Sequence, residues 1–318
     1  MAGAGELSEF ALIQRFFQPL STTSAFVRCG IGDDCALLSP AAGDELALSV
    51  DTLVEGVHFP NNYPADHLAR RALATCVSDL AAAGATPRAF TLALTLPESR
   101  SDWLSAFSAA LAQEAARYSM SLVGGDTTRG PLCLSFQVMG AVPNGKALLR
   151  SGARPGDDIY VSGDLGGARA ALDYLELAAP NEAQQACLER YHRPQARVAL
   201  GEALRDIASA AVDISDGLAA DLGHILSASD VGARLRLQQL PVLAAIAELP
   251  EARDYALSGG DDYELCFTAA PAHRETLMAL SAELHLPLTR IGDIVAQGGL
   301  QCVDAKGAAA ANLGYQHF

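Results

Sequence analysis

The chain has 318 residues, of which half are hydrophobic and only 19% are charged, a balance that favours a folded protein with enough core for one large or two ordinary domains. Its formal net charge of −15 argues against a general nucleic-acid binder, because such a protein needs a basic surface. Seven cysteines without a Cys-x-x-Cys pair are typical of reduced thiols, and no uninterrupted apolar segment reaches the length of a membrane span. The first residues, MAGAGELSEF, carry an acid before any base, unlike a secretory signal. We therefore expect a cytoplasmic protein whose partners are neither nucleic acid nor membrane.

Helices and strands alternate along the first half of the chain. Helical spacing of apolar residues marks the helices, and apolar runs mark the strands. The predicted elements are, in chain order, a helix over residues 6–19, a strand over 45–51, a helix over 66–85, a strand over 91–96, a helix over 100–118 and a strand over 132–142. The last strand is apolar enough to predict burial on both faces.

Residues 143–158 (PNGKALLRSGARPGDD) are rich in Gly, Pro and charge, so we expect a domain boundary there. The N-terminal domain is predicted over residues 1–142 and the C-terminal domain over residues 143–318. The elements predicted beyond the boundary are a strand in IYVSG, helices over 165–178 and 182–206 with Pro194 interrupting the second, a strand in AAVDIS, a helix in GLAADLGHILSAS, a strand over 264–269 and a helix over 272–284. This alternation predicts the α/β class, with two α/β domains of similar size.

Aspartates recur at strand ends, in turns and beside helix starts. They are Asp33, Asp34, Asp51, Asp79, Asp126, Asp213, Asp216, Asp261 and Asp262. For any one of them the default interpretation is a helix cap or an Asx turn. Their recurrence, often beside small residues, instead favours carboxylate ligands for Mg²⁺, with phosphate and water oxygens completing the shell. Arg129 and Arg150 stand next to Gly-rich turns and are candidate phosphate contacts.

Other phosphate and metal chemistries lack their motifs. The chain has no zinc-ligand spacing, no regular EF-hand loop, no P-loop and no protein-kinase catalytic loop. A nucleotide-using enzyme of this composition would depend on metal ions and arginines.

Seven motifs rich in Gly or Asp follow one another along the chain. They are GIGDDCALL, SVDTLVEGVHF, SDLAAAGATP, VGGDTTRGPL, LLRSGARPGDDIYVSG, AVDISDGLAADLGHI and SGGDDYELCFT. Their order resembles that of the thiamine-monophosphate kinase family. The resemblance covers nearly the whole chain, from residue 6 to the closing GYQHF.

The resemblance implies the fold of the aminoimidazole-ribonucleotide-synthetase superfamily. Its N-terminal α/β domain dimerises through its sheet, so we expect a homodimer, and ATP is expected in a cleft between this domain and the C-terminal α/β domain. The implied reaction converts ATP and thiamine monophosphate into ADP and thiamine diphosphate and requires Mg²⁺.

The resemblance also assigns roles to particular residues. The implied ligands of several Mg²⁺ ions are Asp34, Ser49, Asp51, Asp79, Asp126, Asp213 and Asp216. The implied ATP contacts are Gly125, Asp126, Arg150 and Ser215. The implied substrate contacts are His58, Asp261 and Asn312.

Two positions depart from the family pattern. Asp261 stands where the family usually has Glu, so the substrate contact is one methylene shorter. Asn312 stands where some relatives place a Trp against the substrate, and Tyr315 is the nearest aromatic residue that follows.

The acceptor of the implied reaction is itself a phosphate. Its second ionisation falls near pH ~6, so its oxygen is mostly anionic at neutral pH and needs no general base. We therefore expect direct in-line transfer without a phospho-enzyme, governed by positioning and electrostatics, with Asp261 holding the cationic or amine end of thiamine. The alternatives left open are another ATP-using synthetase of the superfamily, a Mg²⁺-dependent phosphohydrolase, and a nucleotide-binding regulatory protein without turnover. The role of Asp33 is also open.

Overall fold

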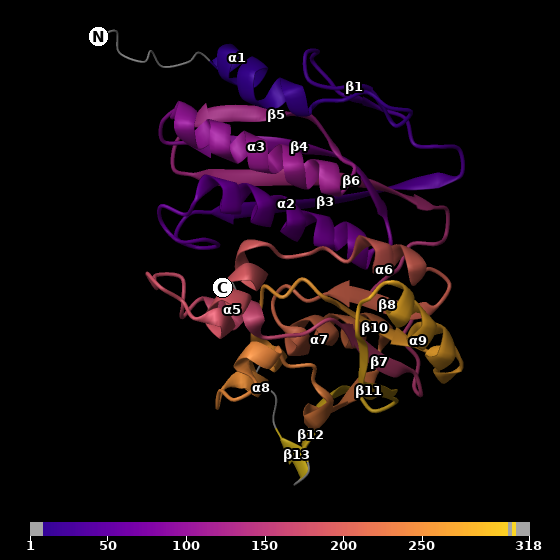
Figure 1. The fold of residues 1–318 in the computed structure, drawn as a ribbon. Coiled ribbons are helices and arrows are strands. Elements are labelled where there is room, and N and C mark those ends of the chain that lie inside the picture. Colours follow the sequence, from indigo (N-terminus) through magenta and orange to yellow (C-terminus); the bar gives the residue numbers. More distant parts are fainter. Residues whose placement is uncertain (1–8, 305–306, 310–318) are drawn as a thin grey trace. The chain divides into compact units, whose positions relative to one another are not determined.

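The computed structural model describes residues 9–304 and 307–309. The chain forms two compact units (Figure 1). Unit 1 comprises Met1–Leu80 and Ala85–Gly145, and unit 2 comprises Ala81–Gly84 and Lys146–Phe318. Each unit is built around a β-sheet of its own.

The sheet of unit 1 has four strands, of which β4 and β5 are parallel and the other neighbours antiparallel. In sheet order they are β3 (Asp44–Val54), β6 (Cys133–Pro143), β4 (Thr86–Leu96) and β5 (Ser121–Arg129). Helices α2 (Ala65–Ala82) and α3 (Ser101–Arg117) lie side by side over one face (Figure 1). Phe90 of β4 and Phe136 of β6 are fully buried, with ring centroids 5.9 Å apart. These aromatic rings belong to the core of unit 1.

The other face of β3 carries exposed apolar side chains. Leu46, Leu48 and Val50 have exposed fractions of 42%, 55% and 65%, and β3 lies at an edge of its sheet. The predicted burial of residues 132–142 on both faces is wrong at Gln137, which is exposed and pairs with Val50. Strand β3 thus presents a stripe of three exposed apolar side chains on one face of an edge strand.

The N-terminal segment is not the single helix predicted over residues 6–19. Its elements are α1 (Glu9–Leu12), the π-helix η1 (Ile13–Phe17) and the 3₁₀ turn η2 (Gln18–Leu20), followed by the short strands β1 (Val27–Cys29) and β2 (Leu37–Leu38). Pro19 in the 3₁₀ turn has no N–H with which to continue an α-helix. The wider π turn accompanies the burial of two adjacent aromatic residues, Phe16 and Phe17.

Strand β5 was not predicted, and it begins with the short apolar stretch SLV at residues 121–123. It continues through Gly124-Gly125-Asp126 to Arg129, paired in parallel with β4. Glycines weaken a strand interior, so composition alone does not predict this extension. A Cβ added at Gly125 would lie 1.9 Å from the carbonyl oxygen of Leu92, which shows that the strands approach each other too closely for any other residue.

The sheet of unit 2 is mostly antiparallel, with only β12 and β9 parallel. In sheet order its strands are β13 (Gly307–Ala309), β12 (Gly299–Asp304), β9 (Gly232–Arg236), β11 (Leu288–Val295), β7 (Asp158–Ser162), β10 (Leu265–Ala269) and β8 (Ala208–Asp213). Its helices are α4 (Gly167–Ala171), α5 (Glu182–His192), α6 (Val198–Ala203), α7 (Leu218–Ser229), α8 (Ala252–Ser258) and α9 (Arg274–Glu283).

Alternating side chains of this sheet enter two separate cores. Ile159 and Val161 pack with apolar residues of α7 and α8 in one core, whereas Tyr160 packs with residues of α6 and α9 in the other. The ring of Tyr160 stacks on Phe267 of β10 with centroids 5.4 Å apart. The sheet is therefore covered on both faces, as its apolar strands require.

The structure confirms one element prediction in unit 2 and corrects another. The predicted interruption of the helical region 182–206 at Pro194 is observed, with α5 and α6 on either side, because proline removes a helical hydrogen bond. Of the predicted helix over 165–178, only α4 is α-helical. Strands β9, β11, β12 and β13 and helix α8 were not predicted.

The cysteines behave as core residues or surface thiols, and all seven are unpaired. Burial raises the pKa of the Cys76 and Cys266 thiols, so neither is a reactive thiolate in the folded chain. Across residues 9–304 and 307–309, no helix combines the length and apolar character needed to cross a membrane.

Candidate active site

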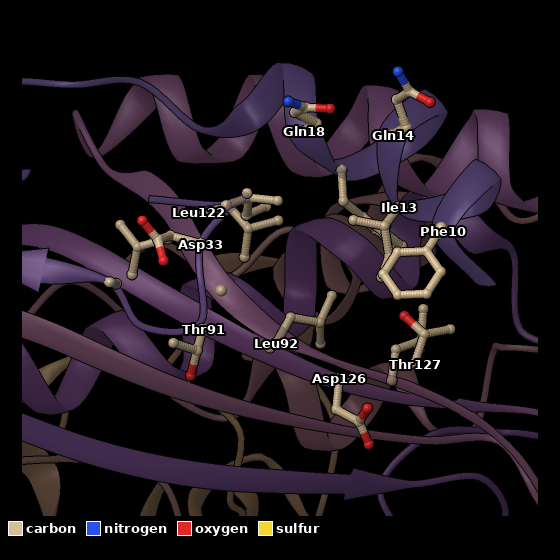
Figure 2. Close-up of a pocket in the computed structure, with 18 of the residues that line it drawn as sticks. Phe10, Ile13, Gln14, Gln18, Asp33, Thr91, Leu92, Leu122, Asp126 and Thr127 are labelled. Atoms are coloured by element: carbon tan, nitrogen blue, oxygen red, sulfur yellow. The ribbon is translucent and has the colours of Figure 1, made fainter. Parts of the chain in front are cut away.

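Unit 1 contains a cavity of about 770 Å³ beside β4 and β5 (Figure 2). Its wall combines apolar side chains of the N-terminal helical segment, including Phe10 and Ile13, with the GIGDD turn and the Gly-Gly-Asp part of β5. Asp34 and Asp126, two of the predicted metal ligands, line this cavity together with Gly125. The fold thus brings together candidate residues that are far apart in the sequence.

The GIGDD turn gives its two aspartates different surroundings. Asp33 Oδ1 accepts a hydrogen bond of 2.8 Å from the backbone N–H of Asp34, and Ser21 Oγ accepts one of 3.1 Å from the N–H of Ile31. Gly32 supplies a φ of +123°, which an L side chain rarely adopts. Asp33 therefore accepts a hydrogen bond within the turn, although both Asp33 and Asp34 are exposed and line the cavity.

A second group of candidates lies on β3 and α2. The Ser49 hydroxyl donates a hydrogen bond to Asp79 Oδ2. Burial raises the pKa of Asp51, and a hydrogen bond with the thiol of Cys76 opposes this rise. Ser49 and Asp51 are half-buried residues of the same strand face, because side chains two apart on a strand point the same way. This group therefore presents oxygen atoms from two elements in one place.

His58 is held in the turn that follows β3. Its Nδ1 accepts a hydrogen bond of 3.0 Å from the backbone N–H of Val54. This contact assigns the lone pair to Nδ1, so the neutral ring carries its proton on Nε2.

In unit 2 the candidates Asp213, Ser215 and Asp216 stand where β8 ends and the turn before α7 begins. Asp213 is buried, with 4% of its surface exposed, and Asp216 is half-buried. The backbone N–H groups of Ser215, Asp216 and Gly217 all donate to Asp221 Oδ2 at 3.0 Å. Burial, and then the nearby charge of Asp216, raise the pKa of Asp221 to about 7.

Asp261 lies in the SGGDDY loop with a φ of +70°. Its backbone N–H donates to the carbonyl of Ser215 at 2.8 Å, and its Oδ1 accepts a hydrogen bond of 3.1 Å from the Tyr263 hydroxyl. A positive φ in a residue other than Gly is uncommon and is often found at functional sites. The substrate candidate and the ATP candidate Ser215 are thus connected through the backbone.

Two carboxylates in this region have structural partners. Asp262, which is half-buried, accepts one bifurcated hydrogen bond from the N–H of Gly166, with its two oxygens at 2.9 and 3.1 Å, and desolvation of its carboxyl group raises its pKa well above the ordinary value. Glu264 is 1% exposed and pairs with Arg197 and the Ser162 hydroxyl. From the sequence, no role was assigned to Asp262, Glu264 or Asp221.

The donor set fits Mg²⁺ better than a transition metal, because every predicted ligand is a carboxylate or hydroxyl oxygen. Within the described part of the chain, no three His, Cys, Asp or Glu side chains are grouped closely enough to hold a metal ion. Mg²⁺ typically binds through one or two carboxylates together with water and substrate phosphates. Such ligation does not require a complete protein cage.

Two further candidates complete the set. Arg150 is exposed, and its backbone carbonyl accepts a hydrogen bond from Ser229. Asn312 lies outside the described residues.

Family models of the AIR synthase related protein match both parts of the chain, the N-terminal domain model over residues 32–142 and the C-terminal domain model over residues 154–305. The thiamine-monophosphate kinase of Escherichia coli strain K12 is 47% identical over 320 aligned residues, covering 98% of each chain. The chain belongs to the thiamine-monophosphate kinase family. It is therefore an enzyme, a kinase with two α/β domains of the AIR synthase type.

Solved structures agree with this family membership. The thiamine-monophosphate kinase of Stenotrophomonas maltophilia K279a is 47% identical, with a TM-score of 0.87 over 95% of this chain and 98% of its own. AaThiL complexed with AMPPCP and TMP is 29% identical, with a TM-score of 0.80 and complete coverage of both chains. These matches confirm the predicted fold class and the predicted membership of the thiamine-monophosphate kinase family.

Proposed function

We propose that the chain transfers the γ-phosphoryl group of ATP to thiamine monophosphate, giving ADP and thiamine diphosphate. The observation that carries this proposal is the 47% identity to a thiamine-monophosphate kinase over 98% of both chains. The complex of AaThiL with AMPPCP and TMP supports both substrates. The unpaired cysteines support a reducing, cytoplasmic location.

The proposed roles within unit 1 rest on its two groups of oxygen atoms. Asp34 and Asp126 would hold Mg²⁺ at the cavity, and Gly125, which lines the same cavity, would contact ATP. Ser49, Asp51 and Asp79 would hold Mg²⁺ where β3 meets α2. The first assignment is supported by the cavity wall that Asp34 and Asp126 share. The second is supported by the hydrogen bond between Ser49 and Asp79. We propose this part, residues 1–142, as the domain that binds ATP and Mg²⁺ and forms the dimer.

In residues 143–318, the proposed C-terminal domain, Asp213 and Asp216 would be Mg²⁺ ligands and Ser215 and Arg150 ATP contacts. Asp261 would hold the cationic or amine end of thiamine, while His58 and Asn312 would contact the same substrate. When bound, Mg²⁺ would neutralise the repulsion between the anionic acceptor and the triphosphate. The backbone connection between Ser215 and Asp261 supports a common orientation of nucleotide and substrate contacts.

We also propose direct in-line transfer without a phospho-enzyme. The acceptor phosphate is already ionised at neutral pH, so its oxygen needs no deprotonation by the chain. The residues then act by binding and orienting the two substrates. Stereochemical analysis with chiral γ-phosphoryl ATP should show inversion at phosphorus. Net retention would contradict direct transfer.

We propose that the exposed stripe of β3 forms the homodimer interface. Leu48 is 55% exposed in the middle of the stripe, a position at which a charge would oppose burial against a second copy. Light scattering should give twice the chain mass for the wild type and a monomer for Leu48→Glu. Arg88→Glu is a control at another exposed strand position of the same sheet and should remain dimeric. A monomeric wild type would contradict the proposal.

One assay tests the reaction against its alternatives. Purified protein is incubated with Mg-ATP and thiamine monophosphate, and the expected products are ADP and thiamine diphosphate in equal amounts. Phosphate release from thiamine monophosphate without ATP would instead indicate a phosphohydrolase. Binding of ATP without consumption would indicate a regulatory protein, and consumption of ATP without thiamine diphosphate would favour another synthetase of the superfamily.

A further inference from the structure

Asp221 makes an unusual set of contacts for a helix residue. It lies in the first turn of the 12-residue helix α7, and one of its oxygens, Oδ2, accepts hydrogen bonds from three successive backbone N–H groups. Only 2% of the Asp221 surface is exposed. The donors belong to the turn that carries Ser215 and Asp216, so a buried carboxylate organises the backbone of a proposed ligand turn.

The three N–H groups that converge on one oxygen fix the backbone conformation of the turn. With their N–H groups engaged by Asp221, residues 215–217 curve around the carboxylate. The backbone carbonyls of Ile214 and Ser215 accept hydrogen bonds from the loop that carries Asp261. Ser215 accepts from the N–H of Asp261, and Ile214 accepts from the N–H of Tyr263, each at 2.8 Å.

Glycines allow the two loops to approach each other closely. A Cβ added at Gly260 would lie 2.4 Å from the carbonyl oxygen of Ser215. Gly217 has a φ of +115°, and its Cβ would lie 2.8 Å from the carbonyl carbon of Ser258. A shift of the turn at residues 215–217 therefore has to move the loop at residues 258–263 as well.

Stability alone does not explain an acidic residue at this position. A buried carboxylate is costly, and Asp221 is only 2% exposed. A serine or threonine cap would satisfy a helix N-terminus without burying a carboxylate. Local arrangements that reduce stability are typical of functional sites.

We propose that Asp221 is a positioning residue that sets the Ser215–Asp216 turn and, through the Ser215 carbonyl, the orientation of Asp261. Asp221 thereby couples nucleotide binding to the binding of thiamine monophosphate. This inference rests on the proposed kinase function. The residue acts through the backbone of its neighbours and does not itself contact either substrate.

The test compares Asp221→Asn with Gly223→Ala in the full-length protein. Gly223 lies on the same helix, and a Cβ added there meets no atom within 4 Å. Loss of a second-sphere contact typically costs about 10–100-fold in activity or metal affinity, so we expect that loss in kcat for Asp221→Asn. We also expect an increase in KM for thiamine monophosphate and weaker binding of Mg-ADP in calorimetry. Gly223→Ala should match the wild type in all three measurements.

A purely structural cap would give a different pattern. Asp221→Asn would then lower Tm while its folded fraction kept wild-type KM values and Mg-ADP affinity, and this result would overturn the proposal. If Asp221→Asn does not fold, Asp221→Glu provides the same test, because it keeps the charge and displaces the turn with a longer side chain. If the wild-type protein shows no turnover, the kinase function is contradicted. If the wild type is active and a folded Asp221 variant has the same kcat, KM and Mg-ADP affinity, only the role of Asp221 is contradicted.

A double-mutant cycle tests the coupling itself. Asp261→Asn, Asp221→Asn and the double variant are compared by KM for thiamine monophosphate. Residues linked through one backbone hydrogen-bond network give non-additive effects, so the double variant should lose less affinity than the product of the two single losses. Additive losses would show that Asp221 and Asp261 act independently and would overturn the coupling.

Discussion

Replacing Asp216 by asparagine is expected to lower turnover by about 10²-fold or more, the usual scale for removing one preorganised charged group from a reacting centre. The same change should not destabilise the chain. Asp216 is one of the causes of the raised pKa of buried Asp221, so its removal relieves a repulsion. Activity and stability are therefore expected to change in opposite directions, as measured by steady-state kinetics and thermal unfolding.

The stabilisation that Asp216→Asn gains by removing the repulsion with Asp221 should depend on pH in the metal-free protein. A carboxyl group whose folded pKa is raised from 3.8 to about 7 binds protons more tightly in the folded state, so its stabilisation is lost as pH rises towards 7. Without Asp216 this loss should be smaller. In EDTA, the Tm of Asp216→Asn should exceed that of the wild type at pH 8 and approach it at pH 4.

Asp254→Asn is the matched control, because Asp254 is an exposed aspartate on α8 of the same unit. It should retain wild-type turnover. Equal losses of activity and Tm in Asp216→Asn would mean that Asp216 only caps the turn, and the metal-ligand assignment would then be wrong.

Replacing Glu264 by glutamine is expected to lower the free energy of unfolding by about 3–5 kcal/mol, because breaking one side of a buried ion pair leaves the other charge uncompensated. The side chains of Glu264 and Arg197 are 1% and 14% exposed. The Ser162 hydroxyl donates to the same carboxylate at 2.6 Å. Gly163 leaves the space for this carboxylate, since a Cβ there would lie 2.2 Å from Glu264 Oε1.

Urea unfolding of Glu264→Gln and of Glu189→Gln measures this difference. Glu189 pairs with Arg193 on the surface, where their side chains are 54% and 49% exposed, and loss of such a pair costs about 0.5 kcal/mol. A loss below about 1 kcal/mol in Glu264→Gln would show that water reaches Arg197 and compensates its charge.

Much of the fold could be predicted from hydrophobic periodicity. Helices α2 and α3 and strands β3 and β7 lie within a few residues of their predicted positions, because each carries an uninterrupted apolar pattern. Strand β5 was not predicted, since Gly-Gly-Asp is a poor strand sequence and only pairing with β4 makes it one. The π-helix at Ile13–Phe17 has no distinctive sequence pattern, because the burial of both Phe16 and Phe17 depends on their tertiary neighbours.

The order of the motifs by itself determined the family, and the comparisons confirmed it. The sequence also indicated that oxygen ligands suited to Mg²⁺ recur along the chain. The resemblance assigned different roles to Asp34 and Asp261, and it left the role of Asp33 open. Asp33 and Asp34 are adjacent in the sequence, yet only Asp33 accepts the hydrogen bond within the turn.

Only the tertiary structure separated the supporting carboxylates from those that a ligand could reach. Asp221 and Glu264 are buried and engaged by backbone N–H groups or an arginine, whereas Asp34 is exposed and Asp216 half-buried. Burial and hydrogen-bond partners come from residues distant in the sequence, and they decide whether a carboxylate is accessible to a cation. A local motif shows that a carboxylate is present, but it does not show which residues surround that carboxylate in the fold.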